Sequence, residues 1–210
     1  RFQLKEVFPT YFICYVGIIV ASVTSPNFGM EAVGTMIFWF GFVCYVALFA
    51  LITLRYLKHE IPAAARPLFC IYAAPMSLSL AGYLSVSENP NLVFVAVLAT
   101  LAQVLFVVVL TQLPKLLAGG FYPSFAAMTF PFVVTATALG MALDALVAGG
   151  VVLPMYEALR TVAFAETIFA AVMVFFVVGS YVRFLVATPK AASAPAVSPV
   201  PSTQMTISAK

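Results

Sequence analysis

The sequence predicts an all-α integral membrane protein with six transmembrane helices paired as three hairpins. Of its 210 residues, 64% are hydrophobic and only 8% are charged, and the mean hydropathy is +1.11. Ordinary globular domains hold about 25% charged residues. So few charges cannot cover the water-exposed surface of a 22.5 kDa particle, so lipid must be its main solvent. These observations exclude a soluble domain.

Six apolar stretches are long enough to cross a hydrocarbon core of about 30 Å. In chain order they cover residues 8–24, 33–54, 68–86, 92–113, 125–147 and 161–186. Backbone polar groups in lipid must be satisfied within each segment, and the alternation typical of barrel strands is absent, so each stretch is predicted to be a helix. Short turns rich in Pro, Gly and Asn separate them, which predicts hairpins over residues 8–54, 68–113 and 125–186.

Lysine and arginine gather on one side of these helices, and cytoplasmic loops collect such residues. On the opposite side the only cation is Arg160, beside Glu31, Glu88 and Glu157. The cations on the first side are Arg1, Lys5, Arg55, Lys58, Arg66, Lys115, Arg183 and Lys190. We therefore expect a multi-pass protein of the plasma membrane, or of the inner membrane in a Gram-negative bacterium, with both ends of this chain in the cytoplasm.

The two ends of the chain carry separate expectations. Residues 1–187 form the predicted transmembrane domain, whereas residues 188–210 are rich in Pro, Ala and Ser and are expected to be a disordered cytoplasmic tail. Arg1 is not an initiator residue, so we expect a piece of a longer protein. The net charge of +3 is small and its cations are scattered, so no nucleic-acid partner is expected.

A repeat relates the first, third and fifth expected helices, each of which opens with a proline. Eight residues after that proline, each helix has a residue that weakens helices. These residues are Gly17, Pro75 and Pro131. Eight helical residues advance about 12 Å, so the three breaks are expected at a similar depth. A proline inside a helix costs about 3 kcal/mol unless a kink absorbs it, and such interruptions are tolerated where the helix faces protein or a water-filled cavity.

Small and hydroxyl residues concentrate around these breaks, whereas the second, fourth and sixth helices are bulky apolar runs such as LFVVVL. The polar candidates are Ser77, Ser79, Thr129 and Thr135. This contrast is typical of an inner, pore-lining set of helices surrounded by a lipid-facing set. The alternative is that prolines and serines are common in membrane helices and mark only close packing. Three breaks in register favour the inner ring.

Three segments carry a resemblance to a known family. They are FPTYFICYVGIIVAS, ARPLFCIYAAPMSLSLAGYL and YPSFAAMTFPFVVTATALG, and within the last the most specific piece is Met128, Thr129, Phe130 and Pro131. From about Val7 to Leu185 the chain resembles the tellurite-resistance/dicarboxylate transporter family. That family includes bacterial tellurite-resistance membrane proteins, the yeast malate permease and sulfite efflux pump, and the plant guard-cell slow anion channel.

The resemblance implies a fold of ten transmembrane helices in five hairpins, with one helix of each hairpin lining a central pore and with protomers assembled as homotrimers. The six expected helices correspond to the fifth to the tenth, so this chain is expected to be the C-terminal part of that fold and to lack the first four. A phenylalanine in the ninth helix plugs the pore of the family. The matching residue here is Phe130.

An aromatic ring beside a kinked backbone can obstruct a narrow apolar tube and move by a rotamer change, which gives Phe130 a physical rationale as a gate. Packing among the 20 phenylalanines is the alternative. The expected inner faces lack lysine and arginine near mid-membrane. An anion would therefore rely on helix dipoles, hydroxyls and freed N–H groups, which predicts weak binding.

Among the acidic residues, Glu166 lies deepest within a predicted span, and acidic groups inside a membrane are candidates for function. The alternative is that Glu166 contacts a neighbouring protomer. No catalytic, metal-binding or cofactor site is expected. His59 is the only histidine, and Cys14, Cys44 and Cys70 fall in three different spans without paired spacing.

The sequence therefore favours a non-enzymatic membrane anion channel or transporter for small inorganic anions or C4-dicarboxylates. A membrane-embedded binding or sensor subunit without a conduit is the alternative. An intramembrane enzyme comes third because the spans lack a polar constellation. Tellurite, sulfite, malate, chloride and nitrate are all handled within the family, and no residue here selects among them.

Overall fold

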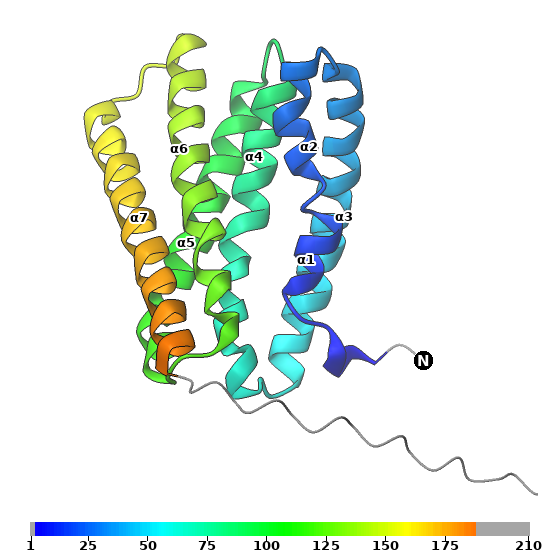
Figure 1. Cartoon of the computed structure of the whole chain (residues 1–210). Coiled ribbons are helices and arrows are strands. Elements are labelled where there is room, and N and C mark those ends of the chain that lie inside the picture. The colour runs from blue at the N-terminus through cyan, green and yellow to red at the C-terminus, as the bar shows by residue number, and fades with distance from the viewer. Residues whose placement is uncertain (1–2, 188–210) are drawn as a thin grey trace, which may run out of the picture.

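The computed structural model describes residues 3–187, which form an all-helical bundle (Figure 1). In chain order its α-helices are α1 Thr10–Tyr15, α2 Ile19–Thr24, α3 Glu31–Lys58, α4 Ala74–Val86, α5 Leu92–Ala118, α6 Phe130–Ala148 and α7 Tyr156–Ala187. The 3₁₀ helices are η1 Leu4–Glu6, η2 Ser25–Phe28, η3 Ala63–Ala73 and η4 Pro123–Met128. The predicted tail and the cations Arg1 and Lys190 lie outside the described residues.

Five helical segments of the described chain are long and apolar enough to cross a membrane. They are Glu31–Lys58, Ala63–Val86, Leu92–Ala118, Pro123–Ala148 and Tyr156–Ala187. The difference from the six predicted spans lies in residues 8–24, which form α1 and α2, each of only six residues. Neither helix alone is long enough to span a bilayer. The predicted first span is therefore a broken helix.

The break between α1 and α2 is built around Gly17. The backbone N–H groups of Val16 and Gly17 both donate to the Phe12 carbonyl oxygen, and the next bonds have 3₁₀ spacing. A Cβ on Gly17 would collide with the Ile13 carbonyl oxygen. Only glycine therefore permits this close approach of backbone to backbone.

The spacing of Pro75 and Pro131 predicted kinks inside two α-helices, and the structure differs. Pro75 and Pro131 each lie in the first turn of an α-helix, directly after a 3₁₀ segment. A proline in this position removes an N–H that has no partner inside the α-helix, so the penalty of an interior proline does not apply. Each predicted kink is thus a junction between a 3₁₀ helix and an α-helix.

Burial divides the long segments into two groups. We compare the share of buried residues in one apolar window of 18 residues from each segment. That share is 72% in Ala63–Val86 and 56% in Pro123–Ala148, against 22% to 28% in α3, α5 and α7. α4 packs against α2, α3, α5 and α6, and α6 packs against α4, α5 and α7. This division matches the predicted contrast between inner and outer helices.

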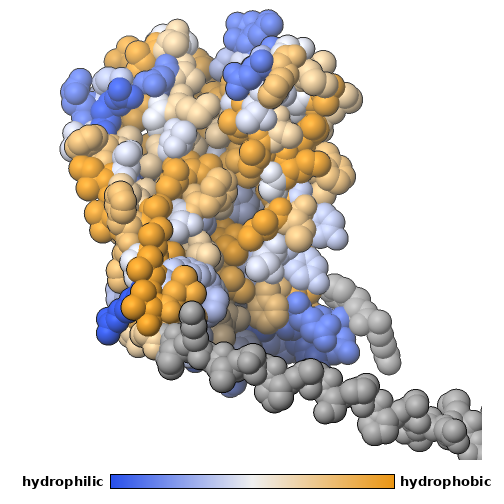
Figure 2. All heavy atoms as spheres, in the orientation of Figure 1, coloured by the Kyte–Doolittle hydropathy of each residue, from blue (hydrophilic) through white to orange (hydrophobic). Residues whose placement is uncertain are grey.

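Polar residues gather at the two ends of the bundle, and hydrophobic residues cover much of the surface between them (Figure 2). Figure 1 places the N-terminal segment, the links that follow α3 and α5, and the end of α7 at one end. The described cations at that end are Lys5, Arg55, Lys58, Arg66, Lys115 and Arg183. Arg160 lies at the other end, where it forms an ion pair with Asp144 at 2.9 Å.

Candidate functional site

A cavity of about 590 Å³ lies between three helical segments at the level of their breaks. The segments are α1 with α2, η3 with α4, and η4 with α6. Gly17, Pro75 and Pro131 all line this cavity. The structure thus brings together the three breaks, which are 58 and 56 residues apart in the sequence.

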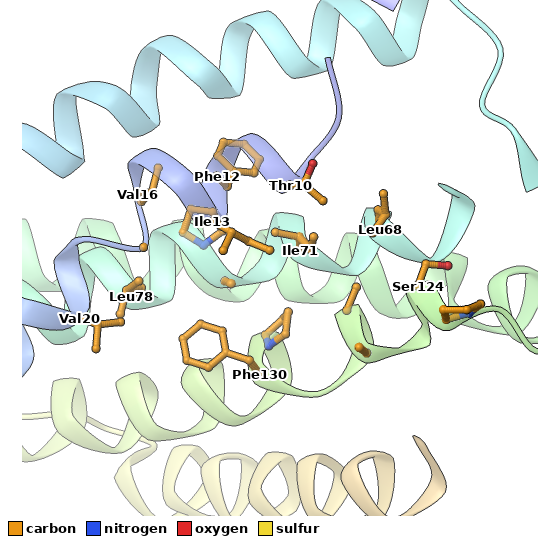
Figure 3. A pocket seen from close by; sticks show the side chains of 17 residues that line it. Thr10, Phe12, Ile13, Val16, Val20, Leu68, Ile71, Leu78, Ser124 and Phe130 are labelled. Atoms are coloured by element: carbon orange, nitrogen blue, oxygen red, sulfur yellow. The ribbon is translucent and has the colours of Figure 1, made fainter. Parts of the chain in front are cut away.

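Phe130 extends into the same cavity. It is the first residue of α6, and 49% of its surface is exposed. Figure 3 shows its ring standing away from α6, in the space toward Leu78 of α4 and Val20 of α2. Three segments far apart in the sequence therefore surround one aromatic ring.

The cavity wall is almost entirely apolar. Among the described residues, Thr10 and Ser124 supply the hydroxyl groups of the wall, and Ser124 Oγ donates to the Ala64 carbonyl oxygen at 2.6 Å. No charged side chain occurs among the lining residues in the described part of the chain. The first turns of α4 and α6 also line the wall, but their backbone N–H groups are already bonded. The Ala74 N–H donates to the Ile71 carbonyl oxygen, and the N–H groups of Phe132 and Val133 donate to the Thr129 carbonyl oxygen.

None of the four predicted pore-lining hydroxyl residues, Ser77, Ser79, Thr129 and Thr135, lines this cavity in the described part of the chain. Ser77, Ser79 and Thr135 are fully buried and are absent from the cavity wall. The hydroxyl oxygens of Ser77 and Thr135 lie 3.0 Å apart and join α4 to α6.

Each predicted hydroxyl also lies within hydrogen-bond distance of a backbone carbonyl oxygen near a break. Ser79 donates to the Pro75 carbonyl oxygen, four residues earlier, at 2.7 Å. Ser77 and Thr135 lie 3.0 and 2.8 Å from the corresponding carbonyl oxygens and 3.0 Å from each other, so when one hydroxyl donates to the other, only the second donates to its helix carbonyl. Thr129, the half-buried residue before α6, donates to the Ala126 carbonyl oxygen at 2.8 Å. Such local bonds use the hydroxyls within the helices and leave them unavailable to an anion in the cavity.

Glu166 is buried on α7, with 6% of its surface exposed. Its carboxylate accepts a long hydrogen bond of 3.4 Å from the Gln103 amide of α5. Neither residue lines the cavity with Phe130, because α5 and α7 lie behind α6 as seen from that cavity. Glu166 therefore contributes to the packing of outer helices and is separate from the candidate site.

Arg55 is a buried cation that the sequence did not predict to be buried, because the predicted helix over residues 33–54 ends just before it. It lies in the last turn of α3 with 2% of its surface exposed. Its guanidinium donates to the carbonyl oxygens of Lys5, His59 and Glu60 at 3.1 to 3.3 Å, and the Phe8 ring centroid is 4.7 Å from Cζ. Tyr56 and Leu57 continue the apolar pattern beyond Arg55, and this was the available signal that the helix continues.

Groups suited to metal or redox chemistry do not come together. Within residues 3–187, no three His, Cys, Asp or Glu side chains lie close enough to hold a metal ion. The three cysteines are free thiols: Cys14 is exposed, Cys44 is half-buried and Cys70 is buried.

The long apolar helices and the cavity among them define a multi-pass α-helical membrane protein. Comparison with protein families then identifies it more closely: the chain belongs to the SLAC1, voltage-dependent anion channel, family, whose model matches residues 1–185. The predicted resemblance is confirmed over almost the same span. Comparisons with curated proteins and with solved structures gave no match.

Proposed function

We propose that this chain is part of an anion channel or transporter in which the cavity at the three breaks belongs to the conduit and Phe130 occludes it. The substrates are small inorganic anions or C4-dicarboxylates. The observation that carries the proposal is the half-exposed ring of Phe130, which stands in a cavity lined by Gly17, Pro75 and Pro131 in a member of an anion channel family. Opening then requires the ring to leave the cavity.

The wall chemistry supports weak binding and fast passage. No charged residue of the described chain lines the cavity, so an anion there is held weakly. A conduit needs binding that is weak enough for the ion to leave. Hydroxyl coordination by Ser77, Ser79 and Thr135 is not part of this proposal, because those groups already bond helix carbonyls or each other.

The topology proposed for the chain in the membrane has six crossings in three hairpins, with both ends in the cytoplasm of a plasma-membrane protein. α1 and α2 together make the first crossing, interrupted at Gly17. Homotrimeric assembly completes the proposal and rests on the family resemblance.

A second function, a binding or sensor subunit without a conduit, is favoured by one observation. The cavity wall is apolar apart from Thr10 and Ser124, which suits an apolar ligand better than an anion. An anion current distinguishes the two functions, because only the channel or transporter is expected to carry one.

Anion conductance of membranes that contain the protein tests the proposal. We expect Phe130→Ala to raise conductance severalfold at matched expression, because it removes the ring from the cavity. Phe40→Ala is the matched control, since Phe40 is an exposed phenylalanine of α3 that does not line the cavity. Background conductance in both the wild-type and Phe130→Ala proteins, although folded and equally assembled, would refute the conduit and favour the sensor.

A further inference from the structure

A cluster of three aromatic rings lies directly behind the turn that carries Phe130. Phe132 of α6 is fully buried between Phe106 of α5 and Phe169 of α7. Its ring centroid is 5.9 Å from that of Phe106 and 5.1 Å from that of Phe169, and both pairs are edge-on. Phe106 and Phe169 also contact each other at 6.2 Å. We call these three residues the aromatic triad.

Phe130 and Phe132 point in opposite directions from the same helical turn. Two residues in an α-helix differ by about 200° around the axis. Phe130 faces the cavity with 49% of its surface exposed, whereas Phe132 is 0% exposed and faces α5 and α7. Any rotation of this turn that swings Phe130 out of the cavity must therefore also move Phe132 within the aromatic triad.

The backbone alone holds this turn weakly. The N–H groups of Phe132 and Val133 share the Thr129 carbonyl oxygen at 3.2 and 3.4 Å, and the Thr129 N–H reaches Ala126 at 3.3 Å. Ordinary backbone hydrogen bonds measure about 2.9 to 3.0 Å. Thr129 itself has φ −102° and ψ −81°, outside the helical region. Pro131 lacks an N–H altogether, so side-chain packing must fix the orientation of the turn.

We propose that Phe132 is a positioning residue for the gate: its seat in the aromatic triad holds the first turn of α6 so that Phe130 lies across the cavity. This inference rests on the proposed function and deepens it. It also connects the outer helices α5 and α7, which do not line the cavity, to the ring that does. Edge-on aromatic contacts of this kind stabilise a pair of rings beyond the area that they bury, so the aromatic triad favours one orientation of this turn.

Conductance in a double-mutant design is the first test. Phe132→Leu is expected to raise anion conductance severalfold in the wild-type background and to add little in the Phe130→Ala background, where no gate remains to be positioned. Phe38→Leu is the matched control, because Phe38 is equally buried in an aromatic cluster of α3 and α4 away from α6. Unchanged conductance in Phe132→Leu, or an equal increase in both backgrounds, overturns the proposal.

A thiol-reactivity assay tests the positioning role without relying on conduction. In a protein carrying Cys14→Ser, Cys44→Ala and Cys70→Ala, Phe130→Cys is alkylated by a water-soluble maleimide. We expect adding Phe132→Leu to change the alkylation rate severalfold, whereas Phe38→Leu leaves the rate unchanged. Equal rates with and without Phe132→Leu overturn the proposal.

The two assays separate the inference from the function on which it rests. If Phe130→Ala fails to conduct, the conduit is refuted, and the alkylation rate still decides whether Phe132 positions the turn. Phe169→Leu provides a second variant of the aromatic triad that removes a half-buried ring and disturbs the core less. It is expected to act in the same direction as Phe132→Leu in both assays.

Discussion

At the scale of single residues, Arg55 shows how a buried charge is accommodated without a carboxylate. Its guanidinium meets three carbonyl oxygens and the face of Phe8. Two of those carbonyls, of His59 and Glu60, follow the last residue of α3, where helix carbonyls lack intrahelical partners. The third, of Lys5, belongs to the segment that leads into α1. Arg55 therefore links the end of α3 to the start of the broken helix.

Replacing Arg55 with leucine is expected to lower the free energy of unfolding by about 2 to 4 kcal/mol, because three partly buried hydrogen bonds to a charged group are lost. Arg55→Lys is expected to recover only part of this loss, since an ammonium lacks the planar fork that spans several acceptors. Thermal unfolding in detergent measures both effects. Arg183→Leu is the control because Arg183 is exposed on α7, and an equal loss there would contradict the assignment.

Spacing and a family motif carry part of the residue-level information. Gly17, Pro75, Pro131 and Phe130 were selected by an eight-residue repeat and a family motif, and they line one cavity. The hydroxyl residues show what spacing does not reveal. A serine near a break can face the cavity or bond the carbonyl four residues earlier, and only the rotation of its helix decides which.

At the scale of elements, the three breaks are built in two different ways. Two of them join a 3₁₀ helix to an α-helix with proline in the first α turn, and the third separates two short α-helices at a glycine. The sequence showed where each helix is interrupted. It did not show the 3₁₀ geometry, because a change from 3.6 to about 3.0 residues per turn leaves no clear mark in an almost uniformly apolar segment.

Gly17→Ala tests the construction of the third break. We expect it to lower the free energy of unfolding by about 1 to 3 kcal/mol, because the new Cβ collides with the Ile13 carbonyl oxygen and forces the backbone to shift. Gly179→Ala in α7 has open space around its Cβ and is expected to be neutral or slightly stabilising. Chemical or thermal denaturation of the two variants gives the comparison. A neutral Gly17→Ala would show that α1 and α2 can join without penalty.

At the scale of the whole molecule, the distribution of charge predicts which end of the bundle faces the cytoplasm. Exposed residues at the two ends allow a labelling experiment that tests this prediction. Lys58 and Glu88 are both exposed; Lys58 is the last residue of α3, and Glu88 lies two residues after the end of α4. The ends of α3 and α4 lie at opposite ends of the bundle (Figure 1). With the native cysteines replaced, we expect Glu88→Cys to react with an impermeant thiol reagent added to intact cells. Lys58→Cys should react only after permeabilisation, because the proposed topology places the end that holds most of the cations in the cytoplasm. The reverse pattern would invert the proposed topology.

The bond between Ser77 and Thr135 has a mechanical consequence for the cavity. It joins α4 to α6 just beyond the two prolines, so these two of the three cavity walls are held to each other. The third wall consists of α1 and α2, whose six residues each are too few for a helix to be stable by itself. We therefore expect this wall to deform more readily than the pair of α4 and α6, so that the volume of the cavity changes there first.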